Sequence, residues 1–237
     1  MAKKMNKNKL LEKKWRRGKR ATLYFYERKS KWKFRSFNKD FPLHDYFGPM
    51  IGDKTEVSIA DIGAGMVSTI GSTWKNVKIR LFPSDVLAND FNKILKYKHE
   101  KYGQYLKHGY KPLYPVEQQD MENLTYDNDS FDIVHCANAL DHCADPFKAV
   151  REMFRVCKPE GWVYLRHFEN NAKLQHYHGL HQWNISLKDD DCLFENIFGD
   201  KFLLSACVNG FKTVKRKELD IEPDDMIISK LQKLIFS

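Results

Sequence analysis

Residues 57 to 65 read Val57-Ser-Ile-Ala-Asp-Ile-Gly-Ala-Gly65, a short apolar run that leads into an acid and two glycines. An apolar run of this length, bounded by a turn signal, predicts a buried strand. Glycine lacks Cβ, so Gly63 and Gly65 let the chain turn sharply where the strand ends and let a ligand approach the backbone closely. Asp61 adds a charge beside that opening. The stretch predicts a ligand site at the carboxyl end of a parallel strand.

Two common glycine motifs do not fit this stretch. A dinucleotide-binding fingerprint needs a third glycine at position 68, where Ser68 stands. A phosphate-binding P-loop needs a lysine and a hydroxyl residue directly after its last glycine, and this pair is missing from the stretch. Binding of nicotinamide dinucleotides or nucleoside triphosphates is therefore disfavoured.

From residue 57 onward, short apolar runs alternate with helical periodicity, which is typical of a parallel sheet with crossover helices. Helices are expected over 90–108 and 146–157, because apolar residues recur there at helical spacing. The expected strands are 57–62, 78–83, 116–119, 131–137, 161–167, 202–207 and 226–231. We predict an α/β fold with a seven-stranded, mostly parallel sheet and helices on both faces.

The composition allows one compact unit. The chain has 237 residues and is 42% hydrophobic, enough for one sizeable core, which we assign to residues 51–237. Residues 1–50 are expected to form a basic leader followed by a small cap of short helices, interrupted by Pro42 and Pro49. The five cysteines form no Cys-x-x-Cys pair and are expected to be reduced and mostly buried.

The N-terminal region carries most of the charge imbalance. The net charge is +9, and residues 1–20 hold ten Lys or Arg against the single acid Glu12. Such a run can contact the phosphates of nucleic acid or acidic lipid, but it is more often a solvated extension or helix face, which we favour. No apolar run approaches the roughly 18 to 20 residues of a membrane helix, and the chain begins with lysines rather than an apolar signal segment. We expect a cytoplasmic protein.

A second candidate ligand lies in the stretch Arg80-Leu-Phe-Pro-Ser-Asp85, where a strand ends in an acid. Asp85 follows the glycines by about 20 residues, the spacing at which a carboxylate accepts from a ribose diol. An isolated loop aspartate is usually no more than a solvated charge. The spacing from Gly65 favours a ribose ligand.

Asp61-Ile-Gly-Ala-Gly65 resembles the first motif of the class I S-adenosylmethionine-dependent methyltransferases. The stretch Gln118-Gln-Asp-Met-Glu-Asn-Leu124 is similar to the segment after the third strand of that family. The stretch 130–146 resembles its fourth-strand motif, and Val156-Cys-Lys-Pro-Glu-Gly-Trp162 resembles its turn into strand five. Together with Asp85, these motifs stand in the family's order over residues 57–168, which is more specific than any one of them. The resemblance implies a Rossmann-like fold and S-adenosylmethionine as cofactor.

The resemblance also implies where the cofactor lies. The glycines would pass beneath its methionine part, Asp120 would accept from the adenine amino group, and Met121 would lie against the ring. The residues expected to contact the cofactor are Asp61, Gly63, Gly65, Asp85, Val86, Asp120, Met121 and Asn138.

The acceptor is expected beyond the carboxyl ends of strands four and five, because open α/β sheets bind ligands there. The residues that follow these strands are Asn138, Asp141, His142, His167 and Glu169. Methylation of a hydroxyl group usually needs a base, and a histidine of near-neutral pKa suits that role. We predict His167 or His142 as the base, with Asp141 beside them. A hydrogen-bonded structural role is the alternative for His167.

Two histidine patterns raise the question of a metal. Asn138-x-x-Asp141-His142 is similar to the Glu-x-x-Glu-His pattern of some quinone-biosynthesis O-methyltransferases, but an amide replaces one carboxylate. Orientation of the substrate, or capping of the next helix, is the plainer role for Asp141 and His142. His176, His178 and His181 suggest zinc, although the segment offers no cysteine or carboxylate at ligand spacing. The metal question stays open.

The segment Gln175-His-Tyr-His-Gly-Leu-His-Gln-Trp-Asn184 is dense in hydrogen-bonding and flat aromatic groups that suit a sugar ring. His181, Gln182 and Trp183 are the expected substrate contacts. With the stretch 167–170, the segment resembles methyltransferases of bacterial surface-polysaccharide synthesis. This implies O-methylation of a sugar or glycan precursor, for example a nucleotide-linked sugar for capsule or lipopolysaccharide.

Two other functions are compatible with the sequence. A nucleic-acid methyltransferase is suggested by the basic leader, although an Asn/Asp-Pro-Pro-Tyr motif is missing after strand four. A cofactor-binding protein without catalysis is the third possibility, and the complete glycine turn with its polar crevice residues argues against it.

Overall fold

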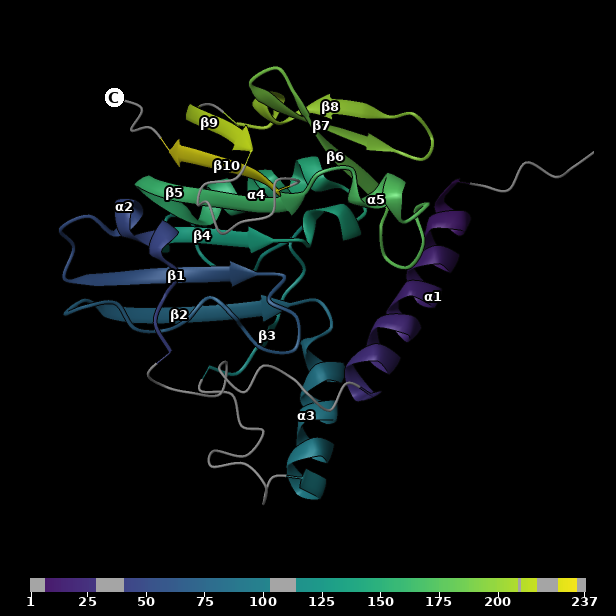
Figure 1. The fold of residues 1–237 in the computed structure, drawn as a ribbon, viewed down its shortest axis with the longest axis horizontal. Helices are drawn as coiled ribbons and strands as arrows, with labels where there is room; N and C mark the ends of the chain where they lie inside the picture. The colour runs from purple at the N-terminus through teal and green to yellow at the C-terminus, as the bar shows by residue number, and fades with distance from the viewer. Residues whose placement is uncertain (1–6, 29–40, 103–113, 209, 217–225, 234–237) are drawn as a thin grey trace, which may run out of the picture.

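The computed structural model describes residues 7–28, 41–102, 114–208, 210–216 and 226–233. Its main sheet has seven strands in the order β3-β2-β1-β4-β5-β10-β9 (Figure 1). The strands are β1 (Glu56–Ile62), β2 (Lys78–Asp85), β3 (Glu117–Gln118), β4 (Phe131–Ala137), β5 (Cys157–Phe168), β9 (Gly210–Arg216) and β10 (Met226–Lys233). Strands β1 to β5 run parallel, whereas β10 is antiparallel to both of its neighbours. The predicted α/β, Rossmann-like fold is confirmed.

The two faces of the sheet are covered by different elements. Successive residues of a strand point to opposite faces, so neighbouring residues of β1 contact different layers. On one face, Ala60 belongs to a core cluster with α4 (Pro146–Val156) and the small sheet described below. On the other face, Ile59 packs with the 3-10 helix η2 (Asp45–Phe47) and with α2 (Gly48–Ile51). Residues 41–51 therefore cover this face, and the connection between β1 and β2 contains no helix.

The predicted strand 202–207 is wrong. Strand β8 (Lys201–Leu203) ends within it, and the 3-10 helix η5 (Leu204–Ala206) follows. Strand β8 belongs to a separate antiparallel sheet with β6 (Trp183–Lys188) and β7 (Asp191–Asn196). The seventh strand of the main sheet is β9, which follows η5. The apolar residues at 202–204 indicate a buried segment, but an apolar run does not show to which sheet the segment belongs.

Residues 7–28 of the basic leader form helix α1 (Lys7–Arg28), so of the two favoured interpretations, a solvated extension or a helix face, the structure has the helix. Figure 1 shows α1 crossing the end of the sheet at which the arrowheads of β1, β2 and β4 point. It contacts α3 (Ala88–Tyr102), where Lys19 Nζ lies 2.7 Å from Asp90 Oδ2. The middle of α1 packs closely against Leu180: a Cβ at Gly18 would lie only 2.6 Å from Leu180 Cδ2.

The remaining expectations are met with shifts at the element ends. The predicted helix 90–108 appears as α3, and its last residues lie outside the described part of the chain. A short helix, α5 (Asn171–Leu174), follows β5. The five cysteines are free; Cys143 is partly exposed and the other four are buried. None of the described helices combines the length and the apolar character of a membrane span.

Candidate active site

The turn after β1 is built by its two glycines. Gly63 has φ 73° and Gly65 has φ 72°, a left-handed conformation that side chains other than glycine rarely adopt. The backbone N–H groups of Gly63 and Ala64 both donate to the carbonyl oxygen of Ser84, at 2.8 and 2.9 Å. A Cβ at Gly63 would overlap the Cβ of Ala139, which follows β4. The turn therefore packs directly against the ends of β2 and β4.

Asp61 anchors this turn from behind. Its side chain is only 4% exposed and points to the sheet face covered by residues 41–51. Ser68 Oγ donates to Asp61 Oδ2 at 2.6 Å, and His135 Nδ1 lies 2.7 Å from Asp61 Oδ1. Asp61 is absent from the residues that line the cavity described below. Asp61 was predicted to contact the cofactor, but in this structure it stabilises the glycine turn through its contacts with Ser68 and His135.

Asp85 stands at the end of β2, opposite the glycine turn. Its Oδ2 accepts from the backbone N–H of Gly65 at 3.0 Å, and its Oδ1 accepts from that of Leu87 at 2.7 Å. Burial raises the pKa of the Asp85 carboxyl, and the charge of Asp61 adds to this, while the two backbone hydrogen bonds oppose it. Each carboxylate oxygen keeps a second lone-pair direction for a ligand.

A cavity of about 570 Å³ opens beside this turn, within the size range of small-molecule sites. It runs from the ends of β1 and β2 to the segment after β4. Seven of the eight predicted cofactor residues line it: Gly63, Gly65, Asp85, Val86, Asp120, Met121 and Asn138. The cavity thus brings together the glycine turn, Asp85 and Asp120, the three features to which the sequence analysis assigned the methionine, ribose and adenine parts of S-adenosylmethionine.

Helix α1 forms one wall of the cavity, which the sequence analysis did not predict. Glu12, Trp15, Thr22 and Tyr26 all line the cavity. The Tyr26 hydroxyl oxygen would lie 2.9 Å from a Cβ at Gly65, and the Tyr26 ring packs on Phe91 with centroids 4.8 Å apart. The sequence does contain a signal for this wall. Glu12, Trp15, Thr22 and Tyr26 are spaced by three, seven and four residues, which places them on one face of a helix.

The loop after β3 supplies the next wall. Asp120 is exposed, and its Oδ1 accepts from the backbone N–H of Glu122 at 2.9 Å. Glu122, a second cavity residue that the sequence analysis missed, accepts from the backbone N–H groups of Ala144 (2.6 Å) and Asp145 (3.1 Å). Burial raises the pKa of the Glu122 carboxyl, with the two backbone bonds opposing it. Glu122 thereby ties the loop after β3 to the segment after β4.

His142 is the predicted base that reaches the cavity. It ends the 3-10 helix η4 (Leu140–His142), and its side chain is 30% exposed. Its Nε2 lies 3.6 Å from Asp141 Oδ2. Burial lowers the pKa of His142, the Asp141 carboxylate raises it, and nearby His181 lowers it again. The net direction is downward, so the ring is neutral at physiological pH.

His181 and Gln182 fix the segment that carries His142. Gln182 lines the cavity, donating from its backbone N–H to the carbonyl oxygen of Asp141 and from Nε2 to that of His142, both at 2.7 Å. His181 Nδ1 lies 2.5 Å from Asp141 Oδ2. The residues Asp141, His142 and His181 bring three potential metal ligands within 4.8 Å of one another. His176 and His178 are not part of this group.

Besides Asp61, Asp141 and His181, which do not line the cavity, three further predicted site residues lie away from it. His167 is 5% exposed and lies against Asp141 and Asn138 in a separate void, where burial lowers its pKa to about 4. Trp183 belongs to the core, and its Nε1–H donates to the carbonyl oxygen of Ala144 at 3.1 Å. Glu169 accepts from the backbone N–H of Leu187 at 3.0 Å. The expectation that strand order places His167 and Glu169 in the crevice is therefore wrong, and so is the substrate contact predicted for Trp183 from the composition of the segment 175–184.

Asn138 joins the ends of β4 and β5. It adopts φ 50°, which asparagine tolerates better than most residues. Its backbone N–H donates to the carbonyl oxygen of Arg166 at 2.9 Å, and its Oδ1 accepts from the backbone N–H of Phe168 at 3.1 Å. The side chain lines both the cavity and the void around His167.

Residues 60–165 match the family described as a methyltransferase domain. The chain is 36% identical over 70 residues to a ubiquinone/menaquinone biosynthesis C-methyltransferase of Idiomarina loihiensis, which covers 29% of this chain and 28% of that protein. It is 43% identical over 44 residues to a ubiquinone biosynthesis O-methyltransferase of Paracidovorax citrulli, covering 19% and 18%. A solved structure of a putative S-adenosylmethionine-dependent methyltransferase from Methanococcus maripaludis aligns with a TM-score of 0.51 and 13% identity, over 91% of this chain and 93% of that one.

These similarities concern residues 60–165 and the fold. The family match over residues 60–165 is to a methyltransferase domain, in agreement with the predicted enzyme class and with S-adenosylmethionine as the predicted cofactor. The similar solved structure shows that the fold extends over nearly the whole chain. The chain spans less than a third of the length of the curated relatives it matches.

Proposed function

We propose that this chain transfers a methyl group from S-adenosylmethionine to a hydroxyl group of a small molecule. One observation carries the proposal: a single cavity joins the glycine turn and Asp85 to His142 and Gln182. Bound S-adenosylmethionine would supply an electrophilic methyl group. The chain's own part is to hold the cofactor at the ends of β1 and β2, to orient the acceptor, and to receive its proton. We propose the cytoplasm as its compartment, as expected from the sequence.

The cofactor end uses backbone and carboxylates. The turn at Gly63 and Gly65 leaves room for the methionine part, because no side chain rises from either residue. Asp85 would accept from the ribose hydroxyls, since it lines the cavity and the N–H groups of Gly65 and Leu87 fix its carboxylate. Asp120 would accept from the adenine amino group, with Val86 and Met121 as apolar walls.

The acceptor end uses His142 as the general base. Its neutral ring can take a proton from an acceptor hydroxyl as the new bond to carbon forms. The Asp141 carboxylate then stabilises the protonated ring, as an adjacent anion does for any histidine cation. Gln182 holds the backbone of both residues. His167 lies behind Asp141 and is not needed for this step.

The acceptor class follows from what lines this end. The sequence favoured a sugar or glycan precursor because of the segment 175–184. In the structure, His176 and His178 of this segment are exposed, and the segment contributes Leu180 and Gln182 to the cavity. Leu180 offers an apolar surface beside Gln182, and Trp15, which packs against the cluster that contains Leu87 and Phe91, adds a flat surface to the cavity wall; such surfaces suit a ring bearing a hydroxyl group. Two similar proteins are named for ubiquinone biosynthesis. We place phenolic acceptors first and sugar precursors second.

The test is a methyl-transfer assay with labelled S-adenosylmethionine. The acceptor panel would contain catechols and other phenols, nucleotide sugars, sugar phosphates, and RNA, with the product position determined by mass spectrometry. Transfer to oxygen of a phenol or a sugar supports the proposal. Transfer to RNA alone would favour the nucleic-acid alternative. Tight cofactor binding without transfer to any acceptor would favour the non-catalytic alternative.

Replacing Asp85 by Ala is expected to weaken S-adenosylmethionine binding by about 1.5–3 kcal/mol, the range for hydrogen bonds to a charged group. Calorimetric titration of the purified variant measures the effect. Asp90→Ala is the matched control, because Asp90 pairs with Lys19 on the neighbouring helix and does not line the cavity. A folded Asp85→Ala variant with wild-type affinity would show that Asp85 does not bind the ribose.

The pH dependence of kcat/KM reports on His142. A base must be neutral, and the pKa of His142 lies below its ordinary value of 6.5. The rate should therefore rise with a midpoint below pH 6.5 and be constant at neutral pH. Because the Asp141 carboxylate raises this pKa, Asp141→Asn is expected to move the midpoint to lower pH. A midpoint above 6.5, or an upward shift in Asp141→Asn, would contradict the assignment; the exposed His178→Ala should leave it unchanged.

A further inference from the structure

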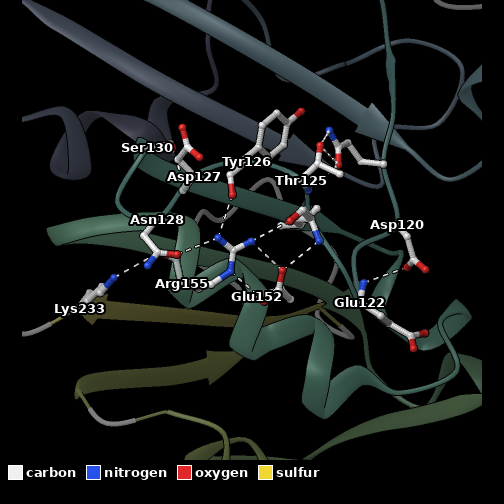
Figure 2. Close-up of polar contacts among 12 residues, drawn as sticks. Asp120, Glu122, Thr125, Tyr126, Asp127, Asn128, Ser130, Glu152, Arg155 and Lys233 are labelled. Atoms are coloured by element: carbon white, nitrogen blue, oxygen red, sulfur yellow. Dashed lines mark hydrogen bonds and ion pairs between the residues drawn. The ribbon is translucent and has the colours of Figure 1, made fainter.

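The loop between β3 and β4 carries three cavity residues, Asp120, Met121 and Glu122, and has no helix to stiffen it. Figure 2 shows that one side chain of α4, Arg155, reaches into the following part of this loop. Arg155 is not among the residues that line the cavity. Its effect on the cavity must pass through the loop.

Arg155 binds two backbone carbonyl groups of the loop. Nη2 donates to the carbonyl oxygen of Leu124 and Nη1 donates to that of Tyr126, both at 2.8 Å. Nη1 also donates to Asn128 Oδ1 at 2.9 Å. Three contacts spread over five consecutive residues fix the path of the loop, because a guanidinium group is planar and rigid.

Glu152, one turn earlier on α4, holds the guanidinium in place. Its two carboxylate oxygens accept from Arg155 Nε at 2.9 Å and from Nη2 at 2.8 Å. Glu152 Oε2 also accepts from the backbone N–H of Leu124 at 2.9 Å. The Arg155 hydrogen bonds lower the pKa of Glu152, so the pair is ionised at neutral pH. The five hydrogen bonds of the Arg155 side chain match its five N–H donors.

We propose that Arg155 is a positioning residue for cofactor binding: it sets the loop that presents Asp120 and Met121 to the adenine part of S-adenosylmethionine. The inference rests on the proposed function. Leu124, which is bound by both Arg155 and Glu152, stands three residues after Met121 in the same loop, so a shift at Leu124 is transmitted to the wall of the cavity. Lysine cannot replace the fork, because its point charge satisfies one or two of these acceptors at a time.

The experiment compares Arg155→Lys and Arg155→Met with Arg151→Lys. Arg151 lies one turn earlier on α4 and packs over the Phe147 ring, so Arg151→Lys controls for a changed cation on this helix. The dissociation constant of S-adenosylmethionine, measured by calorimetry, should rise about tenfold or more in both Arg155 variants and stay near wild type in the control. In steady-state kinetics, KM for the cofactor should rise with it, while kcat and KM for the acceptor change little.

Amide hydrogen exchange provides a readout that needs no bound cofactor. Exchange at residues 119–126 should speed up in both Arg155 variants, while exchange in β1 and β4 should keep wild-type rates. Folded Arg155→Met with wild-type affinity and wild-type exchange in the loop would overturn the proposal. Equal acceleration in the loop and in β1 and β4 would also overturn it, since that pattern reports general destabilisation. Failure of the wild-type protein to bind S-adenosylmethionine would refute the proposed function, while the exchange pattern would still decide whether Arg155 fixes the loop.

Discussion

Replacing His142 by Ala is expected to lower kcat by about 10² to 10⁴, the usual contribution of a general base. His142 is the histidine that lines the cavity, with Asp141 beside it to stabilise the protonated ring. Because the cofactor residues lie at the other end of the cavity, the affinity for S-adenosylmethionine should change little. Single-turnover methyl transfer and calorimetry on the same preparation measure the two effects separately.

Two further variants make this test specific. His178→Ala removes an exposed histidine of the neighbouring segment and should keep wild-type kcat. His167→Ala removes the other candidate base, which is buried away from the cavity, and should lower thermal stability more than kcat. If His142→Ala keeps wild-type kcat and folded His167→Ala loses it, then His167 is the base and the assignment to His142 is wrong.

Replacing Gly63 by Ala is expected to destabilise the fold and to abolish tight cofactor binding. The left-handed conformation costs a residue with a side chain about 1–2 kcal/mol, and overpacking against Ala139 adds about 1–3 kcal/mol. The new Cβ would also stand where the chain turns beside the cavity. Denaturant unfolding measures the loss of stability, and calorimetry the loss of affinity.

Ala139→Gly in the same chain separates these two costs. It removes the Cβ that the new side chain would overlap, so the double variant should recover the part due to overpacking and keep the part due to backbone conformation. A Gly63→Ala protein with wild-type stability and affinity would contradict the role given to the turn. Gly52→Ala serves as the comparison, because Gly52 has φ 56° with nothing within 4 Å of its Cβ position.

The central fold was predictable because its signals are local. The apolar run at 57–62 and the two glycines after it specify a buried strand and a tight turn without help from distant residues. Parallel pairing then aligns Ile62 with Ser84 and with Cys136, so the ends of β1, β2 and β4 meet at one edge. This is why seven of the eight predicted cofactor residues line one cavity.

The acceptor end was less predictable because it depends on tertiary packing. His167 and Trp183 follow the patterns expected of site residues, yet neighbouring elements bury both. Trp15 and Tyr26 belong to a helix whose charged residues suggested a solvated extension or a solvated helix face. Its docking on α3 and Leu180 brings them to the cavity. Sequence spacing identifies a helical face but does not say what it packs against.

The cover of the second sheet face has a consequence for how the chain folds during synthesis. Phe47 and Ile51 share one core cluster with Met226 and Ile228, so residues from both ends of the described chain complete it. A nascent chain exposes its N-terminal region first, and this aromatic segment must wait for β10 before its cluster closes. Tyr46 and Tyr164, whose rings stack on each other, belong to the same cluster and are also incompletely covered until β10 pairs. A chain in which β10 has not yet paired would therefore leave apolar residues of this cluster, such as Phe47 and Ile51, partly uncovered.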